Sequence, residues 1–152
     1  MPQKKITKIF NYSNKDLINL VLNIDEYKNF LPWCLDSKVI SLKNKNKNNI
    51  EIIADLKIGF KSYKEIYTSR VEYDNINSSI TVSCIKGNIR KLLNTWKFNK
   101  LDSNQCSVDF YINIELNNFL LNILFSKFFN YGFDKILESF EDRAKKIIKK
   151  KF

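Results

Sequence analysis

The order in which strand-like alternation and helical spacing follow one another constrains the fold of this chain more than any single residue does. An opening strand and helix lead into several segments in which apolar and polar residues alternate, and the chain closes on one long segment with helical spacing. The clearest alternation runs from Cys106 to Leu116, where every second residue is apolar, as in a half-buried strand. This order predicts an α+β fold in which a curved antiparallel sheet of six to seven strands wraps around a long C-terminal helix.

Local signals place the elements along the chain. Ser13 offers an N-cap for the first helix, and Pro32 must end a short second helix, because the residue before a proline is pushed out of the α region. The polar stretches 43–49 and 100–105 are expected to be hairpin turns. The expected strands are residues 5–12, 38–43, 50–58, 60–73, 80–84, 92–98 and 106–116, and the expected helices are residues 14–24, 27–31 and 118–150.

The strand at 60–73 keeps two alternatives. Tyr63, Tyr67, Ser69 and Val71 share one face, and Ile66, Thr68 and Arg70 share the other. Both faces carry large side chains, so alternation does not decide which of them points inward.

Length and cysteine usage indicate one domain, residues 1–152, in a reducing compartment. A chain of this length buries roughly 70% of the surface that it exposes when unfolded, so it can build a core without disulfides. Cys34, Cys84 and Cys106 lie far apart and form no CxxC motif. Neither a disulfide framework nor a zinc site is therefore indicated.

The usual catalytic residues are missing. The chain has no histidine, which is the commonest general base and metal ligand, and its three glycines cannot form a phosphate-binding loop. We therefore expect no catalytic residue, no metal and no covalently bound cofactor. Glu65 is the carboxylate best placed for acid-base chemistry, with a solvent-facing strand residue beside Lys64 as the alternative. Cys34 is either a reactive thiol or, without an imidazole partner, a small buried residue.

The net charge of +10 favours anionic partners. Nucleic acid, the ribosome and acidic lipid headgroups all fit this charge, and the charge does not choose among them. Much of the excess comes from lysines in the company of asparagines, as in residues 43–49. An AT-rich genome would produce the same composition without selection for binding.

Aromatic residues supply the main positive signal. They make up 14% of the chain, with twelve Phe and seven Tyr, and they recur in both the last strands and the closing helix. Such residues either fill a bulky core or line a pocket for an apolar ligand. The pattern leaves both possibilities open.

The N-terminal segment lacks the apolar run of a signal peptide. The most apolar window, residues 119–133, is interrupted by polar residues and falls short of the ~20 residues that a membrane-spanning helix needs. We therefore expect a protein of the bacterial cytoplasm.

Five sequence blocks, spread over nearly the whole chain, resemble a known family. The blocks are Tyr27-x-x-Phe30-Leu31-Pro32-Trp33-Cys34, Tyr67-Thr68-Ser69-Arg70-Val71, Gly87 followed by Leu92 and Trp96-Lys97-Phe98, Cys106-Ser107-Val108-Asp109-Phe110, and Phe140-Glu141-Asp142-Arg143-Ala144. On these blocks the sequence resembles the START-like coenzyme Q-binding proteins, which include ribosome-association toxins of the RatA type and fall in the polyketide cyclase/dehydrase-like group. It departs from the family at Gly87-Asn88-Ile89, where Gly-Pro-Phe is usual. The change loosens a turn and removes one aromatic ring from the pocket rim.

The resemblance implies a helix-grip (START/Bet v 1-like) fold with a deep cavity that binds ubiquinone or a related isoprenoid lipid. The protein would support respiratory electron transport as a carrier or chaperone, with ubiquinone as a ligand. The loop at Pro32 and Trp33 would act as a gate or a membrane contact. The residues implied to bind the ligand are Tyr27, Phe30, Pro32, Trp33, Tyr63, Glu65, Tyr67, Arg70, Trp96, Phe98, Phe110, Ile112, Phe125, Phe129, Phe133 and Ile136.

The same resemblance implies two other functions. One is a factor that binds the large ribosomal subunit and hinders subunit joining, and the other is a cyclase-type enzyme that acts through Glu65 or a tyrosine. The implied partners are an isoprenoid quinone or another lipid, an anionic membrane in peripheral contact at the inner membrane, or the large ribosomal subunit, but not DNA.

Overall fold

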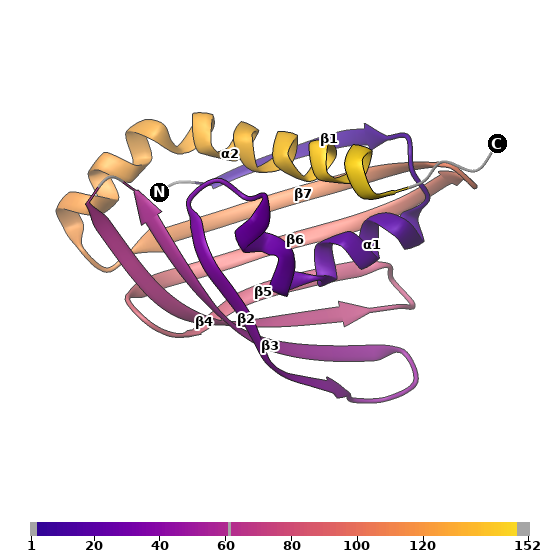
Figure 1. Cartoon of the computed structure of the whole chain (residues 1–152), viewed down its shortest axis with the longest axis horizontal. Helices are drawn as coiled ribbons and strands as arrows, with labels where there is room; N and C mark the ends of the chain where they lie inside the picture. The colour runs from indigo at the N-terminus through magenta and orange to yellow at the C-terminus, as the bar shows by residue number, and fades with distance from the viewer. Residues whose placement is uncertain (1–2, 61, 149–152) are drawn as a thin grey trace.

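One antiparallel sheet of seven strands forms the body of the molecule (Figure 1). The computed structural model describes residues 3–60 and 62–148. The strand order is β1-β7-β6-β5-β4-β3-β2, so the first two strands of the sequence lie at opposite edges of the sheet. The strands are β1 (Gln3–Phe10), β2 (Cys34–Asn44), β3 (Asn49–Phe60), β4 (Tyr63–Asp74), β5 (Ser79–Lys86), β6 (Ile89–Asp102) and β7 (Gln105–Leu116).

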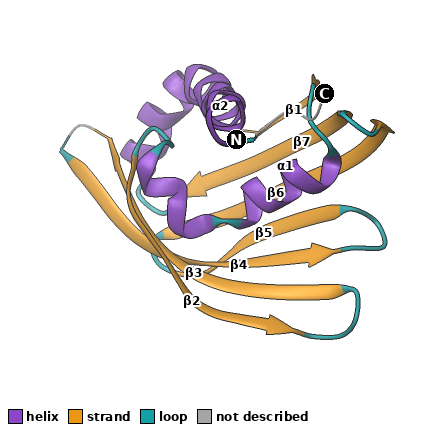
Figure 2. Ribbon diagram, turned by 45° about the vertical axis from the view of Figure 1, so that its right-hand side comes forward, coloured by secondary structure: helices purple, strands orange, loops and turns teal. Residues whose placement is uncertain are grey.

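All the helical segments lie on the concave face of the sheet (Figure 2). The helix α1 (Asn14–Leu22) and the 3-10 helix η1 (Ile24–Asn29) carry the chain from the β1 edge to the β2 edge. The long helix α2 (Phe119–Ile147) closes the concave face. Ser13 caps α1 by accepting a hydrogen bond from the Asp16 amide at 3.1 Å, and Asn118 caps α2 by accepting one from the Leu121 amide at 3.1 Å. This arrangement confirms the predicted fold class.

The hydrophobic core lies beneath the C-terminal half of α2. Leu137, Phe140 and Ala144 of that half are at most 4% exposed. The ring of Trp96 on β6 packs edge-on against Phe140, with 5.0 Å between the ring centroids, and against Phe110 on β7, with 4.7 Å between them. The aromatic side chains of this half therefore fill the space between helix and sheet.

Several element boundaries differ from those predicted. The first strand ends at Phe10, before Tyr12, and the short second helix is a 3-10 helix at residues 24–29 that ends before Pro32. The strand β2 begins at Cys34 and not at Lys38, because two register shifts against β3 break the period of two that the alternation relied on. The strand β6 continues to Asp102, where we expected a turn, since its polar end still pairs with β7.

The closing helix ends at Ile147, before the predicted boundary at about Lys150. Lys145 and Lys146 are exposed on its last turn. Lys149, Lys150 and Lys151 lie outside the described residues.

Candidate functional site

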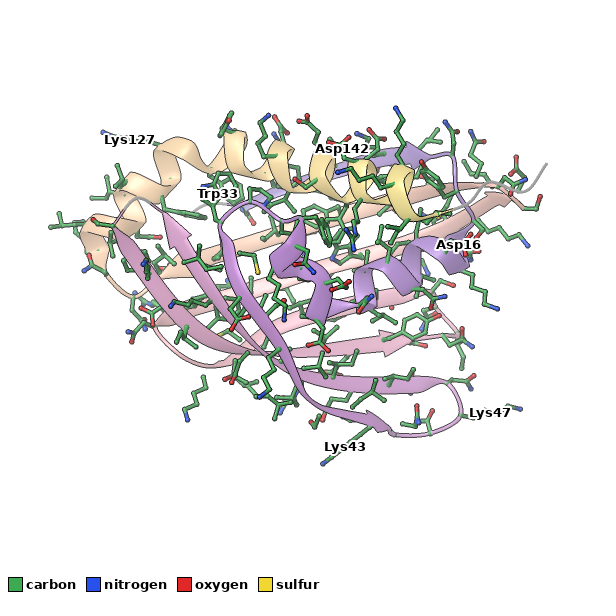
Figure 3. All side chains as sticks on the ribbon, viewed as in Figure 1. Asp16, Trp33, Lys43, Lys47, Lys127 and Asp142 are labelled. Carbon is green, nitrogen blue, oxygen red and sulfur yellow. The ribbon has the colours of Figure 1, made fainter. Side chains whose placement is uncertain are left out.

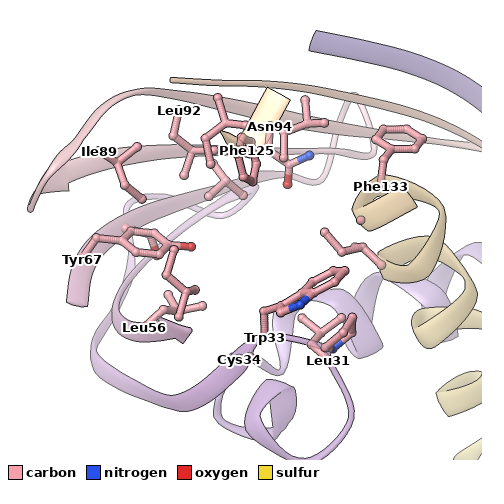
Figure 4. A pocket seen from close by; sticks show the side chains of 18 of the residues that line it. Leu31, Trp33, Cys34, Leu56, Tyr67, Ile89, Leu92, Asn94, Phe125 and Phe133 are labelled. Atoms are coloured by element: carbon pink, nitrogen blue, oxygen red, sulfur yellow. The ribbon is translucent and has the colours of Figure 1, made fainter. Parts of the chain in front are cut away.

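A cavity of about 400 Å³ lies between the concave face of the sheet and α2 (Figure 4). Its lining includes residues of both halves of α2, of the six strands β2 to β7 and of the segment that precedes β2. Among the described residues, none of the lining side chains is charged. The sequence had left open whether the aromatic residues fill this space, and the structure shows that they enclose a hollow. The lining residues are Ile24, Tyr27, Leu31, Pro32, Trp33, Cys34, Leu56, Ile58, Gly59, Ser62, Tyr63, Tyr67, Ser69, Val71, Val82, Ile89, Leu92, Asn94, Trp96, Phe110, Ile112, Ile114, Leu116, Leu121, Leu124, Phe125, Phe129, Gly132, Phe133, Ile136 and Phe140.

The cavity opens at one end of the sheet. Ser62, between β3 and β4, and Leu124 on α2 line the cavity and are also exposed to solvent, so they mark its mouth. The same end holds the turn between β5 and β6, because the amide of Asn117 donates to the carbonyl of Asn88 at 3.1 Å. The mouth is therefore framed by the β3–β4 and β5–β6 connections and the start of α2.

Most of the predicted ligand-binding residues line the cavity. Sequence alternation did not decide which face of β4 points inward. In the structure, the inward face is the one with Tyr63, Tyr67 and Val71. The predicted residues found in the lining are Tyr27, Pro32, Trp33, Tyr63, Tyr67, Trp96, Phe110, Ile112, Phe125, Phe129, Phe133 and Ile136.

Arg70 and Glu65 were both implied to bind the ligand, and neither lines the cavity. Arg70 lies on the opposite face of β4 from Tyr67, and its Nε is 3.5 Å from Oε2 of Glu51 on β3. Glu65 accepts hydrogen bonds from the hydroxyl of Tyr63 at 3.2 Å and from Nδ2 of Asn88 at 3.3 Å. Arg70 is thus a residue of the outer face, and Glu65 joins β4 to the β5–β6 turn.

Phe30 and Phe98 also lie outside the lining. Phe30 packs edge-on against Phe140 of α2, with ring centroids 5.2 Å apart. Phe98 is 3% exposed and stacks on Trp96 at 6.1 Å. Both side chains belong to the core and support the cavity wall from behind.

The hydroxyl of Tyr67 is the most distinctive polar group in the cavity. It points into the hollow from the β4 wall (Figure 4), and among the described residues it has no hydrogen-bond partner. Burial raises the pKa of Tyr67 well above its usual range. The side chain therefore stays protonated at neutral pH and presents a hydrogen-bond donor to whatever occupies the cavity.

Other polar groups of the lining already have partners. Nδ2 of Asn94 donates to the carbonyl of Tyr111 at 2.8 Å, and its Oδ1 accepts from Nε1 of Trp96 at 2.9 Å. The hydroxyl of Tyr27 donates to the carbonyl of Val21, and that of Ser69 donates to the carbonyl of Ala54 at 3.3 Å. These bonds hold the wall in place.

Trp33 forms part of the wall beside the mouth. Its backbone has a φ of 63°, which is strained for a bulky residue, and its carbonyl accepts a hydrogen bond from the amide of Gly59 at 2.9 Å. The indole lies against Gly132 of α2 and edge-on to Tyr131, with ring centroids 6.4 Å apart. The indole thus bridges the gap between the loop and the helix.

Sequence reasoning missed several lining residues. Ser69 lies on the same face of the expected strand 60–73 as Tyr67, and Asn94 lies on the same face as Trp96, so alternation was the available signal; both were passed over because they are polar. Leu31 and Cys34 flank the predicted loop, and their proximity to Trp33 was the available signal.

The thiol of Cys34 is kept in its neutral form. Burial raises the pKa of the Cys34 thiol, with a smaller rise from the charge of Asp36, so the thiol form is stabilised. In the part of the chain that the structure describes, no cluster of three or more His, Cys, Asp or Glu residues could hold a metal ion. The arrangement is suited to holding an apolar molecule that has a hydrogen-bond acceptor.

The sequence profile of the polyketide cyclase / dehydrase and lipid transport family matches residues 11–141. The chain belongs to this family. A START superfamily protein of Mycobacterium smegmatis has the same fold, with a TM-score of 0.78 at 12% identity over 95% of this chain and 98% of that one. The predicted helix-grip fold is thereby confirmed.

Two relatives in this family carry functional names. The ribosome association toxin RatA of Rickettsia prowazekii (strain Madrid E) is 36% identical over 146 residues, which are 94% of this chain and 96% of the toxin. The mitochondrial coenzyme Q-binding protein COQ10 of Dictyostelium discoideum is 29% identical over 145 residues, which are 93% of this chain and 68% of that protein. These matches confirm the resemblance seen in the sequence.

Across residues 3–60 and 62–148, none of the helices combines the length and apolar character needed to traverse a lipid bilayer.

Proposed function

We propose that this member of the family binds an isoprenoid quinone such as ubiquinone, or a related isoprenoid lipid, and supports respiratory electron transport as its carrier or chaperone. The observation that carries the proposal is the uncharged cavity of about 400 Å³ behind the mouth. Its volume falls in the ~300–1,000 Å³ range of small-molecule sites. Burial of an isoprenoid chain there contributes roughly 0.8 kcal/mol for each CH₂ group removed from water.

Tyr67 gives the site a means of orienting a quinone. A quinone ring carries carbonyl oxygens, which accept hydrogen bonds, and the Tyr67 hydroxyl is a donor without a protein partner among the described residues. A bond between them would satisfy the hydroxyl and fix the head group against β4. The remaining apolar walls would contact the isoprenoid chain.

The proposal is tested by identifying the small molecule that co-purifies with the protein. Full-length protein purified from quinone-containing cells is extracted with organic solvent, and the extract is examined for a quinone absorbance band that bleaches on reduction. We expect such a band, and we expect ligand-free protein to take up added ubiquinone. Protein that carries no quinone and also fails to bind added quinone contradicts the proposal.

We propose ribosome binding as the second candidate function. The match to the Rickettsia toxin favours it, and the net charge of +10 suits binding to RNA phosphates. The test is sedimentation of the protein with large ribosomal subunits through a sucrose gradient at low salt. Absence of co-sedimentation there excludes this candidate.

A cyclase-type activity has less support. The lining residues of the described chain carry no charged side chain, and Glu65 lies outside the cavity. If the protein turned over a polyketide-like substrate through Glu65, the turnover would disappear in Glu65→Gln. We expect no turnover in either protein.

A further inference from the structure

The first half of α2 is apolar on two opposite sides. Leu121, Phe125 and Phe129 of this half line the cavity. On the other side, Phe119 and Leu120 are each 75% exposed. A helix on the surface of a soluble protein normally turns a polar face to water. The exposed apolar side of this half is therefore unexplained by packing within the chain.

The exposed side of α2 changes from apolar to charged along the helix. At helical spacing it runs through Leu120, Leu124 and Tyr131 and continues through Glu138 and Asp142, which are also exposed. Its second part is charged, as expected for a face in water. The apolar part is confined to the end of the helix that frames the cavity mouth.

Positive charge surrounds this apolar part. Lys127 projects from the first half of α2 away from the sheet (Figure 3). Lys64 at the start of β4 and Lys86 and Lys91 beside the β5–β6 turn are exposed at the same end of the sheet. None of these four lysines forms an ion pair with another described residue. We call the set Phe119, Leu120, Ile123, Lys64, Lys86, Lys91 and Lys127 the mouth surface.

We propose that the mouth surface docks on an anionic phospholipid bilayer. Its apolar side chains would enter the boundary between headgroups and acyl chains, while the lysines would reach the phosphates around them. This combination of an apolar centre and an unpaired basic surround is complementary to such a bilayer. Docked in this way, the protein would open its cavity directly onto the lipid. The inference builds on the proposed lipid-binding function and adds the surface through which the guest enters.

The test is flotation of the full-length protein with vesicles that contain no quinone. We expect binding to vesicles of phosphatidylcholine mixed with phosphatidylglycerol, and much weaker binding to phosphatidylcholine alone. The double variant Phe119→Ser and Leu120→Ser should lose at least about tenfold in vesicle affinity. A matched control is Ile76→Ser, because Ile76 is 73% exposed in the turn between β4 and β5, at the far end of the sheet.

A second pair of variants tests the charge. Lys127→Glu should weaken binding to the anionic vesicles, and Lys47→Glu, in the hairpin between β2 and β3 at the far end, should weaken it much less. The proposal is overturned if the double variant or Lys127→Glu binds the vesicles as wild type does. It is also overturned if each far-end control loses as much as its partner, or if the apolar side chains instead hold two copies of the chain together in solution.

Uptake of quinone from detergent micelles distinguishes the docking proposal from the proposed quinone-binding function. Phe119, Leu120 and Lys127 do not line the cavity, so their variants should take up quinone as wild type does. Vesicle binding without quinone uptake would contradict the proposed function and leave the docking surface standing. Quinone uptake without vesicle binding would do the reverse.

Discussion

At the scale of single residues, Tyr67 differs from Tyr63 in the hydrogen bonding of its hydroxyl. The hydroxyl of Tyr63 on the same strand is bonded to Glu65 at 3.2 Å, whereas the Tyr67 hydroxyl has no partner among the described residues. A polar group in an apolar cavity costs free energy unless a hydrogen bond satisfies it. Tyr67 is thus the place where the cavity can distinguish a guest with a carbonyl from a plain hydrocarbon.

Replacing Tyr67 with Phe should weaken quinone binding about two- to tenfold, because a net hydrogen bond contributes ~0.5–1.5 kcal/mol. Affinity for an analogue with the same tail but no carbonyl should change little. Both affinities can be measured by quenching of tryptophan fluorescence. The control is Tyr63→Phe, whose hydroxyl already has a partner in Glu65. Equal losses for the quinone and the carbonyl-free analogue would contradict this assignment.

Tyr27 and Tyr67 should also govern stability at alkaline pH. Burial raises the pKa of both hydroxyls in the folded protein, whereas in the unfolded chain each ionises near pH ~10. Their contribution to stability is therefore complete below that pH and is lost as the pH rises above it, by up to about 1.4 kcal/mol per pH unit for each tyrosine. Urea unfolding of wild type and Tyr67→Phe between about pH 9 and 11 measures this. The variant should show the shallower decline, and identical slopes would mean that Tyr67 is not desolvated.

At the scale of elements, the β5–β6 turn positions the wall of the cavity as well as reversing the chain. Gly87 has a φ of 123°, and a Cβ added there would lie 2.8 Å from Cβ of Tyr67. Asn88 of the same turn is bonded to Glu65 and to Asn117, which directly precedes the N-cap of α2. The turn thus joins β4 and α2 at the mouth.

Gly87→Ala should lower the free energy of unfolding by about 1–3 kcal/mol, because the backbone conformation is unfavourable for alanine and the new methyl group meets Tyr67. Chemical denaturation measures the change. Gly132→Ala is the contrasting variant, since its Cβ would meet only the Trp33 ring at 3.4 Å and alanine favours a helix by up to ~1 kcal/mol. Similar effects at both glycines would show that conformation at Gly87 is not the cause.

The sequence predicts elements better than it predicts the positions of single side chains along them. The alternation from Cys106 to Leu116 correctly places Phe110 and Ile112 in the cavity wall. Trp96 and Phe98 share a face of β6, but only Trp96 reaches the cavity, because the position of a residue along its strand relative to α2 is not encoded in alternation. Arg70 was misplaced because large side chains occupy both faces of β4.

At the scale of the whole molecule, core and cavity share the concave face of one sheet. The second half of α2 packs densely on β6 and β7, and part of the remaining space stays open. The fold class followed from the order of the periodicities, but the hollow did not. Whether aromatic side chains fill or enclose a space depends on sheet curvature, to which residues far apart in the sequence contribute.

A larger side chain in the cavity should weaken quinone binding without a comparable loss of stability. Val82 lines the cavity from the middle of β5, so Val82→Phe should place a ring in it and lower quinone affinity at least about tenfold, with stability changed by no more than ~2 kcal/mol. The control is Thr81→Phe, which adds the same ring on the outer face. Quinone extraction and urea unfolding of both variants provide the measurements. Unchanged quinone uptake in Val82→Phe would show that the guest sits elsewhere.

The position of β1 in the sheet affects how the chain folds during its synthesis. Its register runs from Gln3 opposite Asn113 to Phe10 opposite Cys106, and β7 is its only strand partner among the described residues. A nascent chain therefore carries its first strand unpaired until about a hundred further residues have left the ribosome. During synthesis that exposed edge is open to chance pairing with other chains. We expect chaperone contacts on the nascent chain to persist until translation is nearly finished.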